Sequence, residues 1–271
     1  MQHAVVFIGA GPGAADLITL RGARRLGRAE VVLFDALTDP ALREHAPLAR
    51  WVDVGKRGFS SQPGEPGAPA CDASGQARIN ALLVKFAKQG LRVVRLKGGD
   101  PSVFGRLEEE LEALAGAGLL AEVVPGVTAA LAAAAATQRP LTRRGSGRSV
   151  ALTTAMTQAG PLQAMHAMHA SRSADTEVFY MAGRQLGKLA RRLTQAGWPG
   201  DTPASVVSRA GWPDHLASEH CVASLAEASL LHAGRPTVVV VGAGARPLSS
   251  PTLRNPLAVA AETARQISAN L

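Results

Sequence analysis

The stretch Val93-Val94-Arg95-Leu96-Lys97-Gly98-Gly99-Asp100-Pro101 contains the pattern on which the fold prediction for this 271-residue chain rests. A short, mostly apolar run over residues 93–96 predicts a buried strand, and two glycines with a proline end it. The same form recurs at residues 4–8, which run into Gly9-Ala10-Gly11-Pro12-Gly13, and at residues 121–124, which run into Pro125-Gly126. The carboxyl ends of parallel strands share one sheet edge, where ligands of open α/β sheets bind, so we expect these three glycine turns to meet there.

Outward from these turns, apolar strands alternate with helical patterns, which is typical of a parallel sheet covered on both faces. A polar, breaker-rich stretch at residues 138–147 predicts a boundary between an N-terminal α/β domain, residues 1–138, and a C-terminal α/β domain, residues 139–271. The second half is richer in polar residues, and a mixed sheet is expected there. Strands are predicted at 4–8, 31–34, 51–54, 93–96, 121–124, 148–154, 177–181, 204–208 and 237–241, and helices at 15–28, 77–89, 106–115, 127–136, 185–196, 224–232 and 255–269.

Composition excludes several classes of protein. The 46% of hydrophobic residues is a globular proportion, and Cys71 and Cys221 are too few and too far apart for a disulfide scaffold or a cysteine-based zinc site. No signal peptide and no membrane span are expected, and a reducing, cytoplasmic setting fits. The net charge of +8 suits nucleic acid, an anionic membrane or an acidic small molecule. Only ten aromatic residues, six Phe, three Trp and one Tyr, argue against stacking on single-stranded nucleic acid.

The first glycine turn has a rival interpretation. Together with Asp35 at the end of the next strand it imitates a dinucleotide-binding fingerprint. The Gly-x-Gly-x-Gly spacing differs from that fingerprint, however, and Pro12 has no amide hydrogen for a pyrophosphate. A nicotinamide-dependent oxidoreductase therefore stays open as an alternative. Four basic residues, Lys56, Arg57, Lys97 and Arg106, are placed along the same edge by the strand pattern, which predicts a cleft for an anionic molecule.

Taken together, the motifs of this chain resemble those of the tetrapyrrole methyltransferases, and most closely the branch that acts on uroporphyrinogen III. The resemblance covers roughly residues 4–244, and the run from Arg95 to Arg106 is its most specific part. It rests on Gly9-Ala10-Gly11-Pro12-Gly13, Gly55-Lys56-Arg57, Val94 to Pro101 with Phe104-Gly105-Arg106, Val124 to Ala129, Pro140-Leu141-Thr142-x-Arg144, Phe179-Tyr180-Met181 and Thr202-Pro203.

This resemblance implies a two-domain enzyme, usually a homodimer, that binds S-adenosylmethionine in the cleft between its domains and needs no metal. The implied reaction is the methylation of two carbons of uroporphyrinogen III in succession, which gives precorrin-2. Asp35 and Lys56 match the residues proposed to handle protons. The residues that match cofactor contacts are Pro12, Gly98, Gly99, Asp100, Val103, Thr128, Ala129, Met181 and Ala210.

The implied substrate is a polycarboxylate, and guanidinium groups bind carboxylates in pairs of hydrogen bonds. Arg57, Arg106 and Arg144 are therefore the candidate substrate-binding residues, with Arg143 beside them. No nucleic acid and no membrane is expected as a partner.

Three departures from the family pattern keep two further alternatives open. Leu107-Glu108 stands where two glycines are usual, and Thr153-Thr154-Ala155 replaces a Thr-Gly-His motif. A Gly- and Pro-rich loop at residues 58–76 is inserted and is expected to be a lid or disordered. The chain is therefore compatible with a methylase of another precorrin intermediate, or with a degenerate paralogue that only binds the cofactor. The pair His166 and His169 has no evident third ligand, so a metal site is not expected there.

Overall fold

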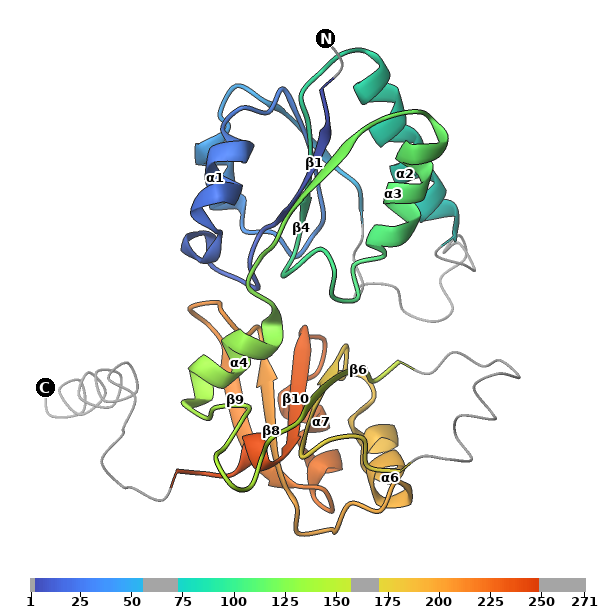
Figure 1. The fold of residues 1–271 in the computed structure, drawn as a ribbon. Coiled ribbons are helices and arrows are strands. Elements are labelled where there is room, and N and C mark those ends of the chain that lie inside the picture. Colours follow the sequence, from blue (N-terminus) through green and yellow to red (C-terminus); the bar gives the residue numbers. More distant parts are fainter. Residues whose placement is uncertain (1–2, 56–72, 157–170, 249–271) are drawn as a thin grey trace, which may run out of the picture.

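The computed structural model describes residues 3–55, 73–156 and 171–248, which form two five-stranded sheets joined by helix α4 (Ala129–Thr137) (Figure 1). The first sheet is built from residues before α4 and the second from residues after it. This is the predicted α/β architecture, with a parallel and then a mixed sheet.

The first sheet is parallel throughout and has the strand order β3-β2-β4-β1-β5. Apolar side chains fill both of its faces, because successive residues of a strand point to opposite sides. Ile8 and Val32 pack toward α1 (Leu20–Leu26), whereas Phe7 and Leu33 pack toward α2 and α3. Figure 1 shows α1 on one face of the sheet and the other two helices on the opposite face. The bounds are β1 Val5–Gly9, β2 Val31–Phe34, β3 Arg50–Asp53, β4 Val93–Lys97, β5 Ala121–Val124, α2 Ala73–Lys88 and α3 Leu107–Gly116.

This strand order argues against the dinucleotide-binding alternative. In the Rossmann arrangement the strand that carries the acidic residue lies directly beside the strand that carries the glycine turn. Here β4 lies between β1 and β2, so the turn after Gly9 and the Asp35 position are separated by a whole strand.

The second sheet has the order β6-β7-β10-β8-β9, with β6 parallel to β7 and the other pairs antiparallel. The two faces carry different clusters of buried residues. Leu189 and Leu193 of α6 pack on one face, and Ala130 and Ala133 of α4 pack on the other. The bounds are β6 Val150–Thr154, β7 Thr176–Tyr180, β8 Pro203–Ser208, β9 Leu216–Cys221, β10 Thr237–Gly242, α6 Leu186–Gln195 and α7 Ala228–Leu231.

Most of the predicted elements agree with the structure. Residues 15–28 form a 3₁₀ turn, Ala15–Leu17, before a shorter α1. Residues 225–231 form a 3₁₀ turn and one helical turn. Strand β9 was not predicted, because Ser218, Glu219 and His220 give it no apolar run. A further 3₁₀ helix at Pro40–His45 was also missed.

Two other predictions concern loops and termini. Residues 73–76, counted in the predicted loop, begin α2, and the rest of that loop lies outside the described residues, as does the predicted helix 255–269. The domain boundary at residues 138 and 139 stays a prediction. Helix α4, which precedes it in the chain, packs against the second sheet.

Candidate functional site

The three glycine turns meet at one edge of the first sheet, as the strand pattern predicts. A Cβ on Gly126 would lie 2.3 Å from the carbonyl oxygen of Gly99, and one on Gly9 would lie 2.5 Å from the Cα of Gly126. The backbones of Gly11 and Gly99 are joined by two hydrogen bonds of 2.6 and 3.3 Å. These turns interlock so closely that a side chain at Gly9 or Gly126 would push them apart.

The Asp100 carboxylate holds this arrangement together. One oxygen accepts a hydrogen bond of 2.8 Å from the Ser102 amide, and the other accepts one of 2.8 Å from the Gly126 amide. Asp100 thereby ties the turn after β4 to the turn after β5. The family resemblance singled Asp100 out as a cofactor contact, and in this structure its two oxygens accept hydrogen bonds from the backbone of these turns.

The first turn also touches the second domain. The Ala14 amide donates a hydrogen bond of 2.8 Å to the Gly211 carbonyl, and a Cβ on Gly13 would lie 2.3 Å from the Gly211 carbonyl carbon. Gly211 has φ +86°, which favours glycine. Pro12 and the Ala210 loop, both predicted from sequence to face the cofactor, are therefore brought side by side.

Four of the predicted cofactor residues pack into one apolar cluster that draws on both domains. Val103 comes from the turn after β4, Ala129 begins α4, and Met181 and Ala210 follow strands of the second sheet. Met181 has φ +57°, and it is half-buried like Val103 and Ala129, so part of each side chain remains accessible. A surface of apolar side chains and glycine backbone suits the adenosine and the aliphatic chain of S-adenosylmethionine, and in that respect the residues fit this cofactor.

Thr128 and Tyr180 form a polar contact beside this cluster. Their hydroxyl oxygens lie 2.7 Å apart, and the Phe104 and Tyr180 rings lie 5.0 Å apart, centroid to centroid. Burial raises the pKa of the Tyr180 hydroxyl above its ordinary value, against a smaller opposite effect of the hydrogen bond to Thr128. Tyr180 therefore stays neutral near pH 7 and links a residue of α4 with the end of β7.

Asp35 lies at the carboxyl end of β2 and is 8% exposed. Its Oδ1 accepts a hydrogen bond of 3.2 Å from the Leu37 amide, and its Oδ2 accepts one of 3.4 Å from the Gly98 amide. The carboxylate thus bridges the loop after β2 and the glycine turn after β4, at the same sheet edge as the other turns.

Behind Asp35 lies a group of buried charges that sequence reasoning missed. Arg95, Lys97 and Glu110 are at most 3% exposed, and Glu110 binds both cations. This corrects the prediction that Lys97 lines the cleft, because its ammonium group is buried against Glu110. A signal for this group was available in the sequence. Arg95 and Lys97 are charged residues at alternate positions of an otherwise apolar strand, so both point to the same face of the sheet.

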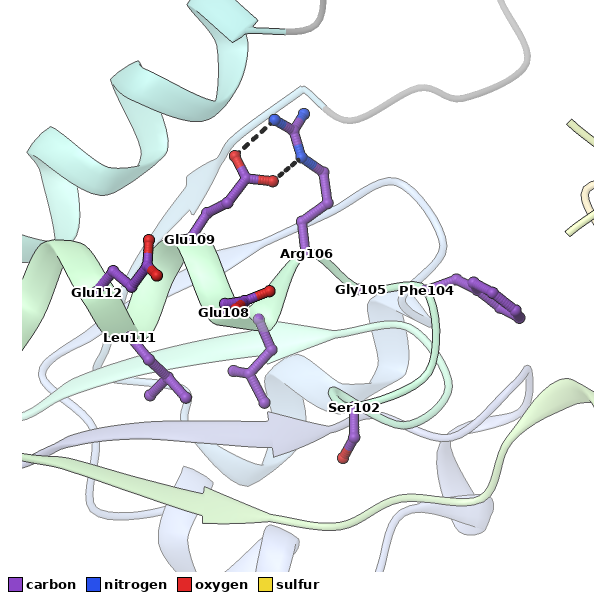
Figure 2. Close-up of a pocket in the computed structure, with 9 residues that line it drawn as sticks. Ser102, Phe104, Gly105, Arg106, Glu108, Glu109, Leu111 and Glu112 are labelled. Carbon is purple, nitrogen blue, oxygen red and sulfur yellow. Dashed lines mark hydrogen bonds and ion pairs between the residues drawn. The ribbon is translucent and has the colours of Figure 1, made fainter. Parts of the chain in front are cut away.

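Arg106 lies in a pocket of about 480 Å³ on the first domain, formed by the turn after β4 and the start of α3. Its guanidinium donates two hydrogen bonds to the Glu109 carboxylate, from Nε to Oε1 at 2.6 Å and from Nη2 to Oε2 at 2.7 Å (Figure 2). Phe104 and Arg106 both have positive φ, 52° and 55°, so this turn is strained at two non-glycine residues. Among the described residues, the pocket is lined by Ser102, Phe104, Gly105, Arg106, Leu107, Glu108, Glu109, Leu111 and Glu112.

Three further residues were predicted to belong to the site, namely Lys56, Arg57 and Arg144. Lys56 and Arg57 lie outside the described residues, as do His166 and His169. Arg144 is exposed. Within residues 3–55, 73–156 and 171–248, no group of three or more His, Cys, Asp or Glu side chains could hold a metal ion. In that same part of the chain, no helix is both long enough and apolar enough to cross a membrane.

Comparison with known proteins agrees with this geometry. The family model for tetrapyrrole (corrin/porphyrin) methylases matches residues 4–229. The chain is 40% identical to the uroporphyrinogen-III C-methyltransferase of Pseudomonas aeruginosa over 255 residues, which cover 92% of this chain and 97% of that protein. It is also 40% identical, over 88% of its length, to the siroheme synthase of Actinobacillus succinogenes, but spans only 48% of that protein.

A solved structure shares the fold. The uroporphyrin-III C-methyltransferase of Thermus thermophilus, complexed with S-adenosylhomocysteine, superposes with a TM-score of 0.71 at 32% identity, covering 89% of this chain and 97% of that one. The match of the family model over most of the sequence shows that this chain belongs to the tetrapyrrole methylases.

Proposed function

We propose that this chain transfers methyl groups from S-adenosylmethionine to two carbons of uroporphyrinogen III, giving precorrin-2. The observation that carries the proposal is the 40% identity to the Pseudomonas enzyme over 97% of that enzyme's length. The interlocked glycine turns and the apolar cluster beside them support it, because they supply a cofactor surface of the right chemical kind.

The residues that would hold S-adenosylmethionine are those predicted from sequence. Pro12 and the Gly98-Gly99 turn offer backbone at the sheet edge, whereas Val103, Ala129, Met181 and Ala210 offer small apolar contacts. Asp100 and Thr128 keep these surfaces in place. When bound, the cofactor supplies a methyl group already activated on a sulfonium, so the protein's main task is to position the acceptor carbon.

Asp35 and Lys56 are the proposed proton-handling residues. As a carbon of the macrocycle gains the methyl group, positive charge builds on the ring and a proton must leave. The Asp35 carboxylate, held by two amides at the sheet edge, can stabilise that charge or accept the proton. Lys56, which is outside the described residues, would return a proton or hold an acidic side chain of the substrate.

The substrate carries several carboxylates, and Arg57, Arg106 and Arg144 are proposed to bind them. Glu109 already occupies the guanidinium fork of Arg106. A substrate carboxylate would therefore replace Glu109 or share the fork with it, which makes Glu109 an intramolecular competitor at this position. The cytoplasmic location, the homodimer, the lack of a metal and the absence of nucleic-acid and membrane partners are parts of the same proposal.

The test is an anaerobic assay with uroporphyrinogen III and methyl-labelled S-adenosylmethionine. We expect label in a dimethylated product with the absorbance of precorrin-2, and strongly reduced turnover in Asp35→Asn and Lys56→Ala. Unchanged rates in both variants would remove their assigned roles. A protein that binds S-adenosylhomocysteine by calorimetry but transfers no label to this substrate would instead be a methylase of another precorrin or a cofactor-binding paralogue.

A further inference from the structure

The buried charges behind Asp35 form a connected network. Glu110 Oε1 lies 3.0 Å from Arg95 Nε, and Glu110 Oε2 binds the Lys97 ammonium. Arg95 Nη1 donates to the carbonyl oxygens of Leu96, at 2.7 Å, and Leu33, at 3.4 Å. Its Nη2 lies 3.7 Å from Asp35 Oδ2. Two cations and two carboxylates thus form one chain from α3, across β4, to the end of β2.

Glu110 is the central member of this network. It is fully buried, and it is the residue that touches both cations. Removing its charge would take from Arg95 and Lys97 the buried carboxylate that they share, and loss of one partner of a buried ion pair is strongly destabilising. Arg95 would then be drawn toward Asp35, since Arg95 Nη2 has no hydrogen-bond partner among the described residues.

The network also supports the turn that carries Arg106. A Cβ on Gly105 would lie 3.0 Å from Cε of Lys97, so the Lys97 side chain lies directly beneath that turn. Glu110 therefore acts in two directions: through Arg95 on Asp35, and through Lys97 on the strained turn at residues 104–106.

We propose that Glu110 is a positioning residue for methyl transfer, which fixes the Asp35 carboxylate and the Phe104–Arg106 turn relative to each other by binding Arg95 and Lys97 together. The proposal rests on the proposed function, because it assigns Asp35 a part in the reaction. It does not place Glu110 in contact with the substrate or the cofactor.

The experiment compares Glu110→Gln with a matched control, Glu122→Gln. Glu122 also forms an ion pair of 3.0 Å, with Arg25, but on a half-exposed part of the first sheet. For Glu110→Gln we expect kcat to fall about 10- to 100-fold, as for a displacement of about 1 Å at a reacting group, while the KM for S-adenosylmethionine changes less than about threefold. The control should keep both constants.

A double-mutant cycle tests whether Glu110 acts through Asp35. If Glu110 acts in part through Asp35, Glu110→Gln lowers kcat by a clearly smaller factor in an Asp35→Asn background than in the wild-type protein. The proposal would be overturned if the fall in kcat in the double variant equalled the product of the falls in the two single variants. That result would mean that the two residues act independently.

Amide hydrogen exchange tests the same point without any substrate. The Leu37 and Gly98 amides, which donate to Asp35, should exchange at least about tenfold faster in Glu110→Gln, with no change at Val239 in the second sheet. Equal acceleration at all amides would show a merely structural role and overturn the proposal. If the wild-type protein transfers no methyl group to uroporphyrinogen III, the proposed function fails, and this exchange measurement still decides the positioning.

If Glu110→Gln does not fold, the variant Lys97→Gln with Glu110→Gln restores the charge balance, since Arg95 and Asp35 remain as a pair. The positioning role predicts a stable protein that still turns over slowly, with fast exchange at Leu37 and Gly98. Recovery of wild-type turnover in this variant would contradict it.

Discussion

His232 shows how strongly one buried side chain can make stability depend on pH. Its ring is fully buried in the second domain, with Nδ1 2.6 Å from the Ser208 hydroxyl and Nε2 2.8 Å from the Ser218 hydroxyl. Burial lowers its pKa from 6.5 to about 4, and the charges of His220 and Arg235 act in the same direction. The native protein therefore keeps this imidazole neutral where the unfolded chain would protonate it.

The first prediction follows from that difference. Because the pKa is lower in the folded state, stability falls as the pH drops from 6.5 toward about 4, and changes little more below that. At about 1.4 kcal/mol per pKa unit, the total is roughly 3 kcal/mol. Urea unfolding at several pH values should show this loss, and His232→Gln should flatten it. If the free energy of unfolding fell equally steeply with pH in the two proteins, His232 would not be the cause of the loss.

A second prediction concerns Tyr180. Replacing it with Phe removes the 2.7 Å contact to the Thr128 hydroxyl but keeps the ring beside Phe104. We expect a loss of about 1 kcal/mol in the free energy of unfolding, which is typical of one hydrogen bond. The affinity for S-adenosylhomocysteine should fall as well, because Thr128 and Tyr180 border the proposed cofactor surface. Chemical denaturation measures the free energy of unfolding, and calorimetry measures the affinity. If neither quantity changed in the variant, the result would argue against the contact.

Among the elements, the connection from β4 to α3 contains the largest number of proposed site residues for its length. It contains the glycine turn, the Asp100 carboxylate that holds two turns together, and Arg106 immediately before the helix. Three glutamates, Glu108, Glu109 and Glu110, occupy the first turn of α3, where the helix dipole favours negative charge. The helix begins at Leu107, which with Glu108 occupies the two positions where the family pattern has glycines.

The third prediction tests the geometry of this connection. In Gly105→Ala the new Cβ would lie 2.5 Å from the Pro101 carbonyl oxygen, so the turn has to move. Overpacking of this kind costs about 1–3 kcal/mol, and it should lower turnover of uroporphyrinogen III much more than S-adenosylhomocysteine binding. Gly116→Ala at the end of α3 is the control and should leave both unchanged, because its Cβ would meet no atom of the described residues outside its own helix within 4 Å.

At the scale of the whole molecule, the proposed site exists because two sheets meet through a few residues. The first turn abuts the Gly211 loop, Thr128 contacts Tyr180, and Val103 packs with residues of the second sheet. Neither sheet by itself contains the complete set of residues proposed to hold the cofactor. Binding therefore depends on how closely these loops approach each other.

The fourth prediction addresses this approach. Gly13→Ala would place a Cβ 2.3 Å from the Gly211 carbonyl carbon and push the two loops apart. Calorimetry should show weaker S-adenosylhomocysteine binding by about 1–3 kcal/mol, while both domains remain folded by circular dichroism. Gly187→Ala serves as the comparison, because in the part of the chain that the structure describes its Cβ would come no closer than 4.0 Å to another element, at Ala226. Wild-type affinity in Gly13→Ala would show that the contact does not shape the site.

Local patterns in the sequence were enough to predict the two α/β halves, the parallel first sheet, the glycine turns at one edge and the family. This is because apolar runs, glycines and prolines act over a few residues. They also indicated Asp35, Val103, Ala129, Met181 and Ala210 as site residues, by resemblance. Strand β9 was not predicted, because its polar residues resemble those of a loop.

Only the tertiary structure decided what depends on contacts between distant segments. It placed β4 between β1 and β2, which removes the dinucleotide-binding arrangement. It buried Lys97 against Glu110 instead of leaving it in the cleft. No local pattern reports that Lys97 will be buried, because its burial and its pairing with Glu110 depend on how α3 lies beside β4 and not on the neighbours of Lys97 in sequence.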